Sequence, residues 1–128
     1  MGFRRYILSS GREIIGGKSA ESNDRLVFAA KPKDILLHTE KPGSPFVNVG
    51  ENPSKKDIRE AAVFCARYSQ DWRDRGQDVV VNMFLRSNMN KPVKMETGSW
   101  EVSRQEKVRV KREDILRYDE DLKENEAD

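Results

Sequence analysis

The amphipathic stretch from residue 55 to residue 75 constrains the fold more than any other feature of the chain. Its apolar side chains recur at helical spacing and share one face. They are Ile58, Ala61, Ala62, Cys65, Tyr68 and Trp72. Ser54 can cap the start of a helix, and Gly76 suits the left-handed residue that often ends one. The pattern therefore predicts one long helix over residues 55–75 with a single apolar face.

Several strand patterns surround this helix. The run DVVVNMFLRS is almost continuously apolar, which is typical of an inner strand. The segments FRRYILSS and REIIGG predict a hairpin that turns at Ser10-Gly11, and DILLHT and PFVNV predict two more strands. Later in the chain, apolar and polar residues alternate around positions 93–95, 100–102 and 108–110. Such alternation predicts a sheet with one dry face and one wet face.

A short helix is predicted in SAESNDRLVFAA, where Ser19 can cap the first turn and Leu26 and Val27 lie near one stripe. Strands and helices are therefore mixed along the chain, and hairpin links dominate its second half. This order predicts an α+β domain. We expect a mixed or antiparallel sheet with the long amphipathic helix and one or two short helices.

The formal net charge of +2 hides an asymmetry. Residues 119–128 contain six acids and one lysine, so they carry −5 and leave +7 on the rest of the chain. Residues 86–112 contain eight Lys or Arg and three Glu, which makes the wet face of the late strands basic. We predict a domain over residues 1–118 and an acidic, flexible tail over 119–128. A basic body suggests a polyanionic partner, although a solubilising tail on an ordinary domain explains the charge equally well.

The residue content excludes several kinds of site. A single cysteine excludes an internal disulfide, and a single histidine leaves no conventional zinc cluster. We therefore expect no metal and no cofactor. No apolar run reaches the length of a membrane span and no signal peptide opens the chain. Together with the lone cysteine, this predicts a cytoplasmic protein without a membrane partner.

The motif GGKS at residues 16–19 resembles the end of a phosphate-binding P-loop, but its context differs. The first glycine of that motif would fall on Arg12. Ile14 and Ile15 would also occupy the loop, and β-branched residues resist the positive φ angles of a phosphate cradle. We interpret GGKS as a tight turn at the corner between hairpin and helix, with Lys18 free to meet a phosphate.

Catalytic chemistry has few candidate groups. Cys65 lies in the middle of the apolar helical face, where a thiol is usually inert packing. Asp34 and His38 share one face of a predicted strand, but four residues of strand separate their backbones by roughly 13 Å. That distance excludes a direct bond in a straight strand. We predict no catalytic residues, and an RNA-processing enzyme that uses Asp34 and His38 stays open as the less favoured alternative.

A family resemblance becomes visible in the order of the residues. SSGREIIGGKSAESNDRLVFAAKPKDILLHTEKPGSPFVNV, followed by DIREAAVFCARYS and a closing set of basic strands, resembles the NFACT-R domain. The likeness covers residues 3–112. The polar signature of the family falls on Gly17, Lys18, Asn23, Asp24, Asp34, His38, Gly43 and Ser44. This chain departs from the family pattern at Pro45 and in KPVKMETGSW, where the glycine arrives late, at Gly98.

The resemblance implies a non-enzymatic RNA-binding module linked to translation, ribosome quality control or tRNA metabolism, with tRNA or rRNA as partner. The phosphate contacts are expected at Arg12, Lys18, Lys41, Lys91 and Lys94. Directional hydrogen bonds to the RNA are expected from Asn23, Asp24, Asp34, His38 and Ser44. The alternative is a protein-interaction adaptor that docks on ribosome-associated proteins.

Overall fold

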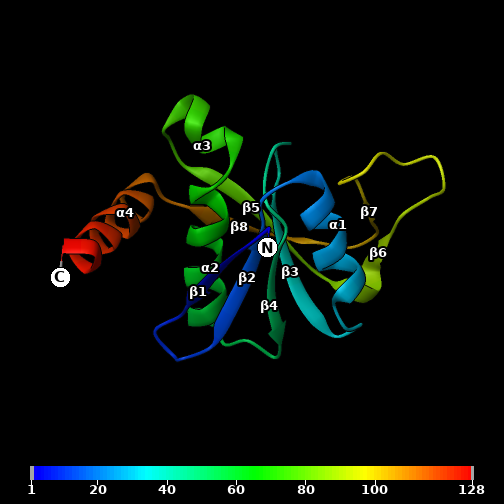
Figure 1. Cartoon of the computed structure of the whole chain (residues 1–128), viewed down its shortest axis with the longest axis horizontal. Coiled ribbons are helices and arrows are strands. Elements are labelled where there is room, and N and C mark those ends of the chain that lie inside the picture. The colour runs from blue at the N-terminus through cyan, green and yellow to red at the C-terminus, as the bar shows by residue number, and fades with distance from the viewer. Residues whose placement is uncertain (1, 128) are drawn as a thin grey trace.

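Six strands form one antiparallel sheet in the computed structural model, which describes residues 2–127 (Figure 1). Their spatial order is β1-β2-β4-β3-β5-β8, so that β3 and β5 lie in the interior. The strands are β1 (Phe3–Ile7), β2 (Glu13–Gly17), β3 (Asp34–Thr39), β4 (Val47–Glu51), β5 (Val79–Leu85) and β8 (Glu106–Val110). Outside this sheet, a short 3-10 turn leads into a small ribbon of two paired strands. These elements are η1 (Arg86–Asn88), β6 (Met89–Asn90) and β7 (Glu101–Val102).

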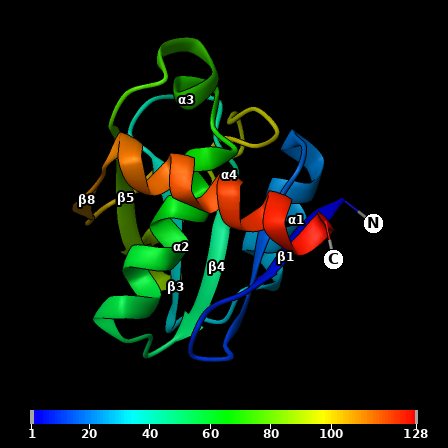
Figure 2. The same cartoon turned by 90° about the vertical axis from the view of Figure 1, so that its left-hand side faces the viewer.

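Helices cover both faces of the sheet (Figures 1 and 2). The four helices are α1 (Ala20–Ala29), α2 (Lys55–Arg67), α3 (Gln70–Arg75) and α4 (Arg112–Ala127). Side chains alternate along a strand, so Leu36 of β3 packs with α1 whereas Leu37 packs with α2 and α4. The sheet thus separates two apolar clusters, a larger one under α2 and α4 and a smaller one under α1. No helix within residues 2–127 has the length and apolarity to cross a membrane.

The fold class predicted from the sequence is confirmed, and so are several elements. The sheet is antiparallel, β5 is an inner strand, and β1 and β2 form the expected hairpin. Gly11 has a φ of 92° in the hairpin turn, a conformation that favours glycine. Ser19 caps α1 by accepting a hydrogen bond from the backbone N–H of Ser22 at 3.1 Å.

The prediction of a single helix over residues 55–75 is wrong in its extent, because the helix is interrupted at Tyr68 and Ser69. Ser69 Oγ donates to the Ala66 carbonyl at 2.6 Å and accepts from the Trp72 N–H at 3.2 Å. One side chain thereby ends α2 and caps α3. The apolar periodicity continues through the break because Tyr68 and Trp72 both pack against the larger cluster.

The strand expected around residues 93–95 is also wrong. The Met95 N–H donates to the Pro92 carbonyl at 2.9 Å, which closes a turn. Val93 is fully exposed, so the alternation of Val93, Lys94 and Met95 reflects no buried face. We call residues 89–102, from β6 through this loop to β7, the flap.

The predicted boundary after residue 118 falls inside α4. Ile115 and Tyr118 are buried in the larger cluster, and Leu122 packs against it. Beyond the boundary, Arg67 Nε donates to Asp119 Oδ1 at 2.5 Å. Helical structure therefore extends through most of the acidic segment, while its flexibility stays a prediction. Residue 128 lies outside the described residues.

We predict that α4 is part of the folded core. Replacing Ile115 by Ala removes a fully buried side chain and should lower the free energy of unfolding by about 2–5 kcal/mol. Leu116→Ala, at the neighbouring exposed position, is the matched control and should cost well under half as much. Urea denaturation followed by circular dichroism measures both. Equal, small effects of the two variants would contradict the core placement of α4.

Candidate functional site

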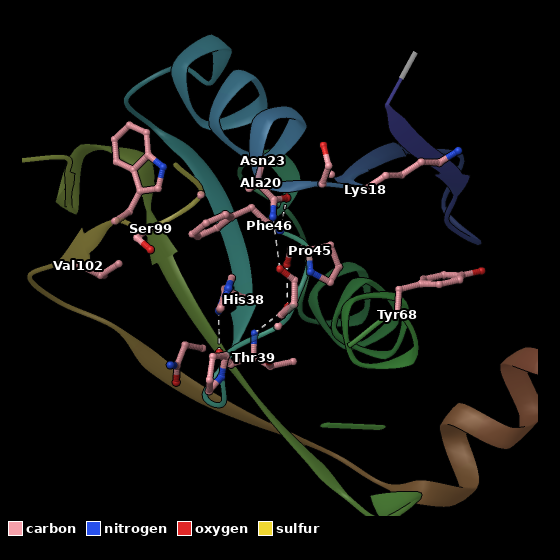
Figure 3. Close-up of a pocket in the computed structure, with 18 of the residues that line it drawn as sticks. Lys18, Ala20, Asn23, His38, Thr39, Pro45, Phe46, Tyr68, Ser99 and Val102 are labelled. Atoms are coloured by element: carbon pink, nitrogen blue, oxygen red, sulfur yellow. Dashed lines mark hydrogen bonds between the residues drawn. The ribbon is translucent and has the colours of Figure 1, made fainter. Parts of the chain in front are cut away.

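A cleft of about 780 Å³ opens on the α1 side of the sheet (Figure 3). Its floor is formed by His38 of β3, by Asn82 and Phe84 of β5, and by Phe46, which precedes β4. The start of α1, the loop over residues 40–46, the corner between α2 and α3, and the flap form its walls. Residues far apart in the sequence therefore meet here.

Asn23 fastens α1 to the loop that leads into β4. Its Nδ2 donates to the Ser44 carbonyl at 3.4 Å, and its Oδ1 accepts from the Phe46 N–H at 3.0 Å. Gly17 lies directly against this amide, since a Cβ at position 17 would sit 1.9 Å from Asn23 Oδ1. The second glycine of GGKS is thus explained by close approach rather than by a turn, because Gly16 and Gly17 both belong to strand β2.

Ser44 shapes the opposite wall. Its hydroxyl accepts from the Thr39 N–H at 3.1 Å and donates to the Pro45 carbonyl at 2.8 Å. The preceding residue, Gly43, has a φ of 86°. Its carbonyl accepts a hydrogen bond from the Gln70 N–H at 2.7 Å, which links the loop to the start of α3. Ser44 is buried, so its hydrogen bonds hold the loop instead of pointing at a ligand.

Asp24, the next residue after Asn23, holds the flap. Its Oδ1 accepts from Trp100 Nε1 at 2.9 Å, from the Gly98 N–H at 3.0 Å and from Lys91 Nζ at 3.3 Å. Lys91 Nζ also donates to the carbonyls of Glu96 and Ser99, both at 2.8 Å. An ammonium has three protons. All the donor capacity of Lys91 is therefore used inside the protein.

His38 lies at the centre of the cleft floor (Figure 3). Its Nδ1 donates to the Thr39 carbonyl at 2.7 Å, which fixes the neutral tautomer with the lone pair on Nε2. The ring packs on Phe46 with 4.5 Å between ring centroids. Burial lowers the pKa of His38 below its ordinary value of 6.5, and the Thr39 carbonyl opposes the shift only in part.

Cations line the cleft beside α1 and α3. Lys18, Arg4 and Arg73 border it together with one carboxylate, Glu40, which is paired with Lys107. The Arg4 guanidinium lies 3.8 Å from the centre of the Tyr68 ring, and Arg73 donates to the Tyr68 carbonyl at 3.3 Å. Lys18 Nζ has no hydrogen-bond or ion-pair partner within residues 2–127. These side chains make the rim electropositive.

The structure brings together only part of the predicted site. Lys18, Asn23, His38 and Ser44 border the cleft. Asp24 and Lys91 lie behind it and hold the flap, and Lys94 is exposed on the flap itself. Lys41 lies outside the cleft lining, 3.9 Å from Asp71.

Arg12 and Asp34 lie elsewhere and serve local structure. Arg12 donates to the carbonyls of Val49 and Asn52, at 2.8 and 3.3 Å. Asp34 accepts from the Lys31 N–H at 2.9 Å and from Asn48 Nδ2 at 3.1 Å. Asp34 and His38 therefore share no cleft, which removes the geometric basis for a catalytic pair.

Three residues that line the cleft were not predicted from the sequence: Arg4, Arg73 and Asn82. Arg4 stands beside a second cation, Arg5, in β1, and Arg73 follows the break after α2 that the sequence pattern did not reveal, so neither differed from the other surface cations. The sequence could have indicated Asn82 as a candidate site residue, because it is the one polar residue inside the apolar run VVVNMFL. As expected for packing, Cys65 is fully buried, and burial raises the pKa of its thiol to about 12.

The comparisons with known proteins agree with this α+β architecture. The family model described as the NFACT protein RNA binding domain matches residues 2–104. The chain therefore belongs to this family of RNA-binding domains. Among solved structures, it is similar to the C-terminal part of the fibronectin/fibrinogen-binding protein from Streptococcus suis, with 26% identity and a TM-score of 0.78. That match covers 87% of this chain and 45% of the other. No curated protein sequence matches the chain.

We predict that Asp24 keeps the flap closed. Asp24→Ala removes the acceptor of three hydrogen bonds and should lower the free energy of unfolding of the flap by about 1.5–3 kcal/mol. The chain has two tryptophans, so Trp72→Phe leaves Trp100 as the only reporter. In that background the emission should shift to the red with Asp24→Ala. It should stay unchanged with Glu21→Ala, an exposed acid on the same helix. An unchanged emission with Asp24→Ala would contradict this role.

We also predict that His38 titrates below pH 6.5. The chain contains a single histidine, so its ring gives one unambiguous NMR titration curve. The unfolded chain binds a proton at the ordinary pKa of 6.5 and the folded chain only at lower pH. The contribution of His38 to stability is therefore complete above pH 6.5 and declines as the pH falls toward the folded pKa. A midpoint at or above 6.5 would show that the ring is not shielded.

Proposed function

We propose that the chain binds RNA through the cleft on the α1 side of its sheet. Tyr68 and the rim cations would contact the backbone, and the floor would face the bases. The partner is tRNA or rRNA, in a role linked to translation, ribosome quality control or tRNA metabolism in the cytoplasm. The observation that carries the proposal is the electropositive rim of this cleft in a member of an RNA-binding family.

The rim supplies the kind of contact that RNA backbones need. Lys18 is unpaired within residues 2–127, so it can approach a phosphate without breaking an internal ion pair. The Arg4 guanidinium already lies over the Tyr68 ring, so less freedom is lost when it binds. Phosphate contacts from such residues fix the register of the RNA without reading its sequence.

The late strands contribute less positive charge than the sequence suggested. Lys107 of β8 is paired with Glu40, and Arg109 Nε lies 3.3 Å from Asp78 Oδ2. Lys91 is likewise occupied in holding the flap. Lys94 remains as an exposed cation on the flap, next to Met95, which borders the cleft. We therefore place the phosphate contacts at Lys18, Arg4, Arg73 and Lys94.

A rival function is a protein-interaction adaptor. The similar structure carries the name of a fibronectin/fibrinogen-binding protein, although this chain spans only 45% of it. The polar, cationic rim of the cleft favours RNA over an apolar protein surface. The binding measurement below separates the two.

We predict that the cleft cations set RNA affinity and its salt dependence. The double variant Lys18→Ala and Arg73→Ala should weaken binding to tRNA and single-stranded RNA. It should also reduce the slope of log affinity against log salt by about 0.7 for each lost phosphate contact. Lys56→Ala, an exposed cation at the start of α2, should leave both unchanged. Fluorescence anisotropy with labelled tRNA, single-stranded RNA and duplex DNA across salt concentrations measures these quantities.

The three ligands decide between the candidate functions. Preference for RNA, lost in the double variant, supports the proposal. Equal binding to all three nucleic acids reduces the protein to a general polyanion binder. The absence of binding at moderate salt favours the adaptor.

A further inference from the structure

One buried polar atom of the cleft floor lacks a partner. Asn82 is 9% exposed and borders the cleft, yet its Oδ1 has no hydrogen bond to any of residues 2–127. It is the only buried side-chain oxygen or nitrogen of the described residues in that condition. A buried acceptor without a donor destabilises the fold, and a native structure that keeps one needs a reason. A donor on a ligand would be such a reason.

His38 places a second free acceptor beside the first. His38 of β3 and Asn82 of β5 are direct partners across the antiparallel ladder. Their side chains leave the same face of the sheet at neighbouring positions. Because Nδ1 of His38 donates to Thr39, Nε2 is left as an acceptor, and it makes no hydrogen bond within the described part of the chain. Two acceptors without a partner therefore lie on adjacent residues of the floor, and the Asn82 oxygen is shielded from solvent.

The surroundings restrict what can donate to these acceptors. Phe46 and Phe84 border the pair and, each 4% exposed, make its surroundings apolar, which suits an uncharged ring. The rim cations disfavour a cationic donor such as a lysine side chain. They favour an anionic chain that carries a neutral donor. The donor should therefore be uncharged, part of an apolar ring and attached to an anionic chain. An exocyclic amino group on a nucleobase meets these conditions, because single-stranded RNA exposes its base edges and carries phosphates alongside.

We propose that Asn82 and His38 form a recognition site for one unstacked RNA base bearing an exocyclic amino group. Cytosine, adenine and guanine have such a group and uracil does not. The Asn82 oxygen is shielded in the present arrangement, so binding of the base requires a rotation about the terminal torsion of this side chain, which is a soft one. This inference rests on the proposed function, since it names the part of the RNA that the cleft reads.

The test compares cytidine and uridine decamers, which have equal charge and length. The intact protein should bind the cytidine decamer on the order of tenfold more tightly, in keeping with two hydrogen bonds gained. Asn82→Leu has a similar volume and no polar atom. It should bring the cytidine affinity down to that for uridine, with the larger loss on the cytidine decamer, and not lower the melting temperature. Gln105→Leu, at an exposed polar position that also lines the cleft, should keep the preference.

The outcomes separate this inference from the proposed function. Equal affinity for the two decamers, with the salt dependence of a phosphate contact, overturns the base site and leaves RNA binding by the cleft intact. The base site is also overturned if Asn82→Leu lowers the melting temperature but keeps the preference for cytidine, because Asn82 is then purely structural.

If neither decamer binds, the tRNA measurement above decides on the proposed function, and NMR with CMP and UMP decides on the base site. A stronger shift of the His38 ring with CMP supports a site for the free nucleotide, and equal or absent shifts reject the site.

Discussion

The cleft depends on two neighbouring side chains near the start of α1, which hold different walls. Asn23 bonds to the loop before β4 through both ends of its amide, and Asp24 collects three donors from the flap on one oxygen. The helix itself is fixed by the packing of Leu26 and Val27 against the sheet. A rigid, apolar contact thus positions a polar pair, and the pair positions two irregular segments whose own apolar residues Phe46, Met89 and Trp100 join the same cluster. The absent side chain at Gly17 is required because the Asn23 amide occupies its space.

Sequence patterns predicted the fold where periodicity and burial coincide. The run VVVNMFL fills an inner strand, and the hairpin and α1 follow from ordinary turn and capping residues. The long helix was overextended because Tyr68 and Trp72 keep the apolar period across a break that Ser69 creates through two hydrogen bonds. Helix α4 was missed because its acids dominate the composition. The spacing of Ile115, Tyr118 and Leu122 carried the helical signal.

The candidate site was less accessible to sequence reasoning, for a physical reason. Residue type reveals that a side chain can donate or accept, but not whether it does so within the protein. Asn23, Asp24 and Ser44 were expected to contact a ligand, and they use their hydrogen bonds to build the walls. Lys91 is occupied in the same way. Conversely, Arg4 became part of the site only through the fold, which brings β1 next to Tyr68 at the end of α2.

The separation of the two apolar clusters by the sheet has a practical consequence. Helix α4 packs with α2 on the face opposite α1 and the flap (Figures 1 and 2). An attachment made through the outer surface of α4 would therefore leave the mouth of the cleft unobstructed. Immobilising the protein by this helix on a sensor surface would present every molecule with the same side outward. Labels or tethers on α1 or the flap would instead block the approach of a ligand to the cleft.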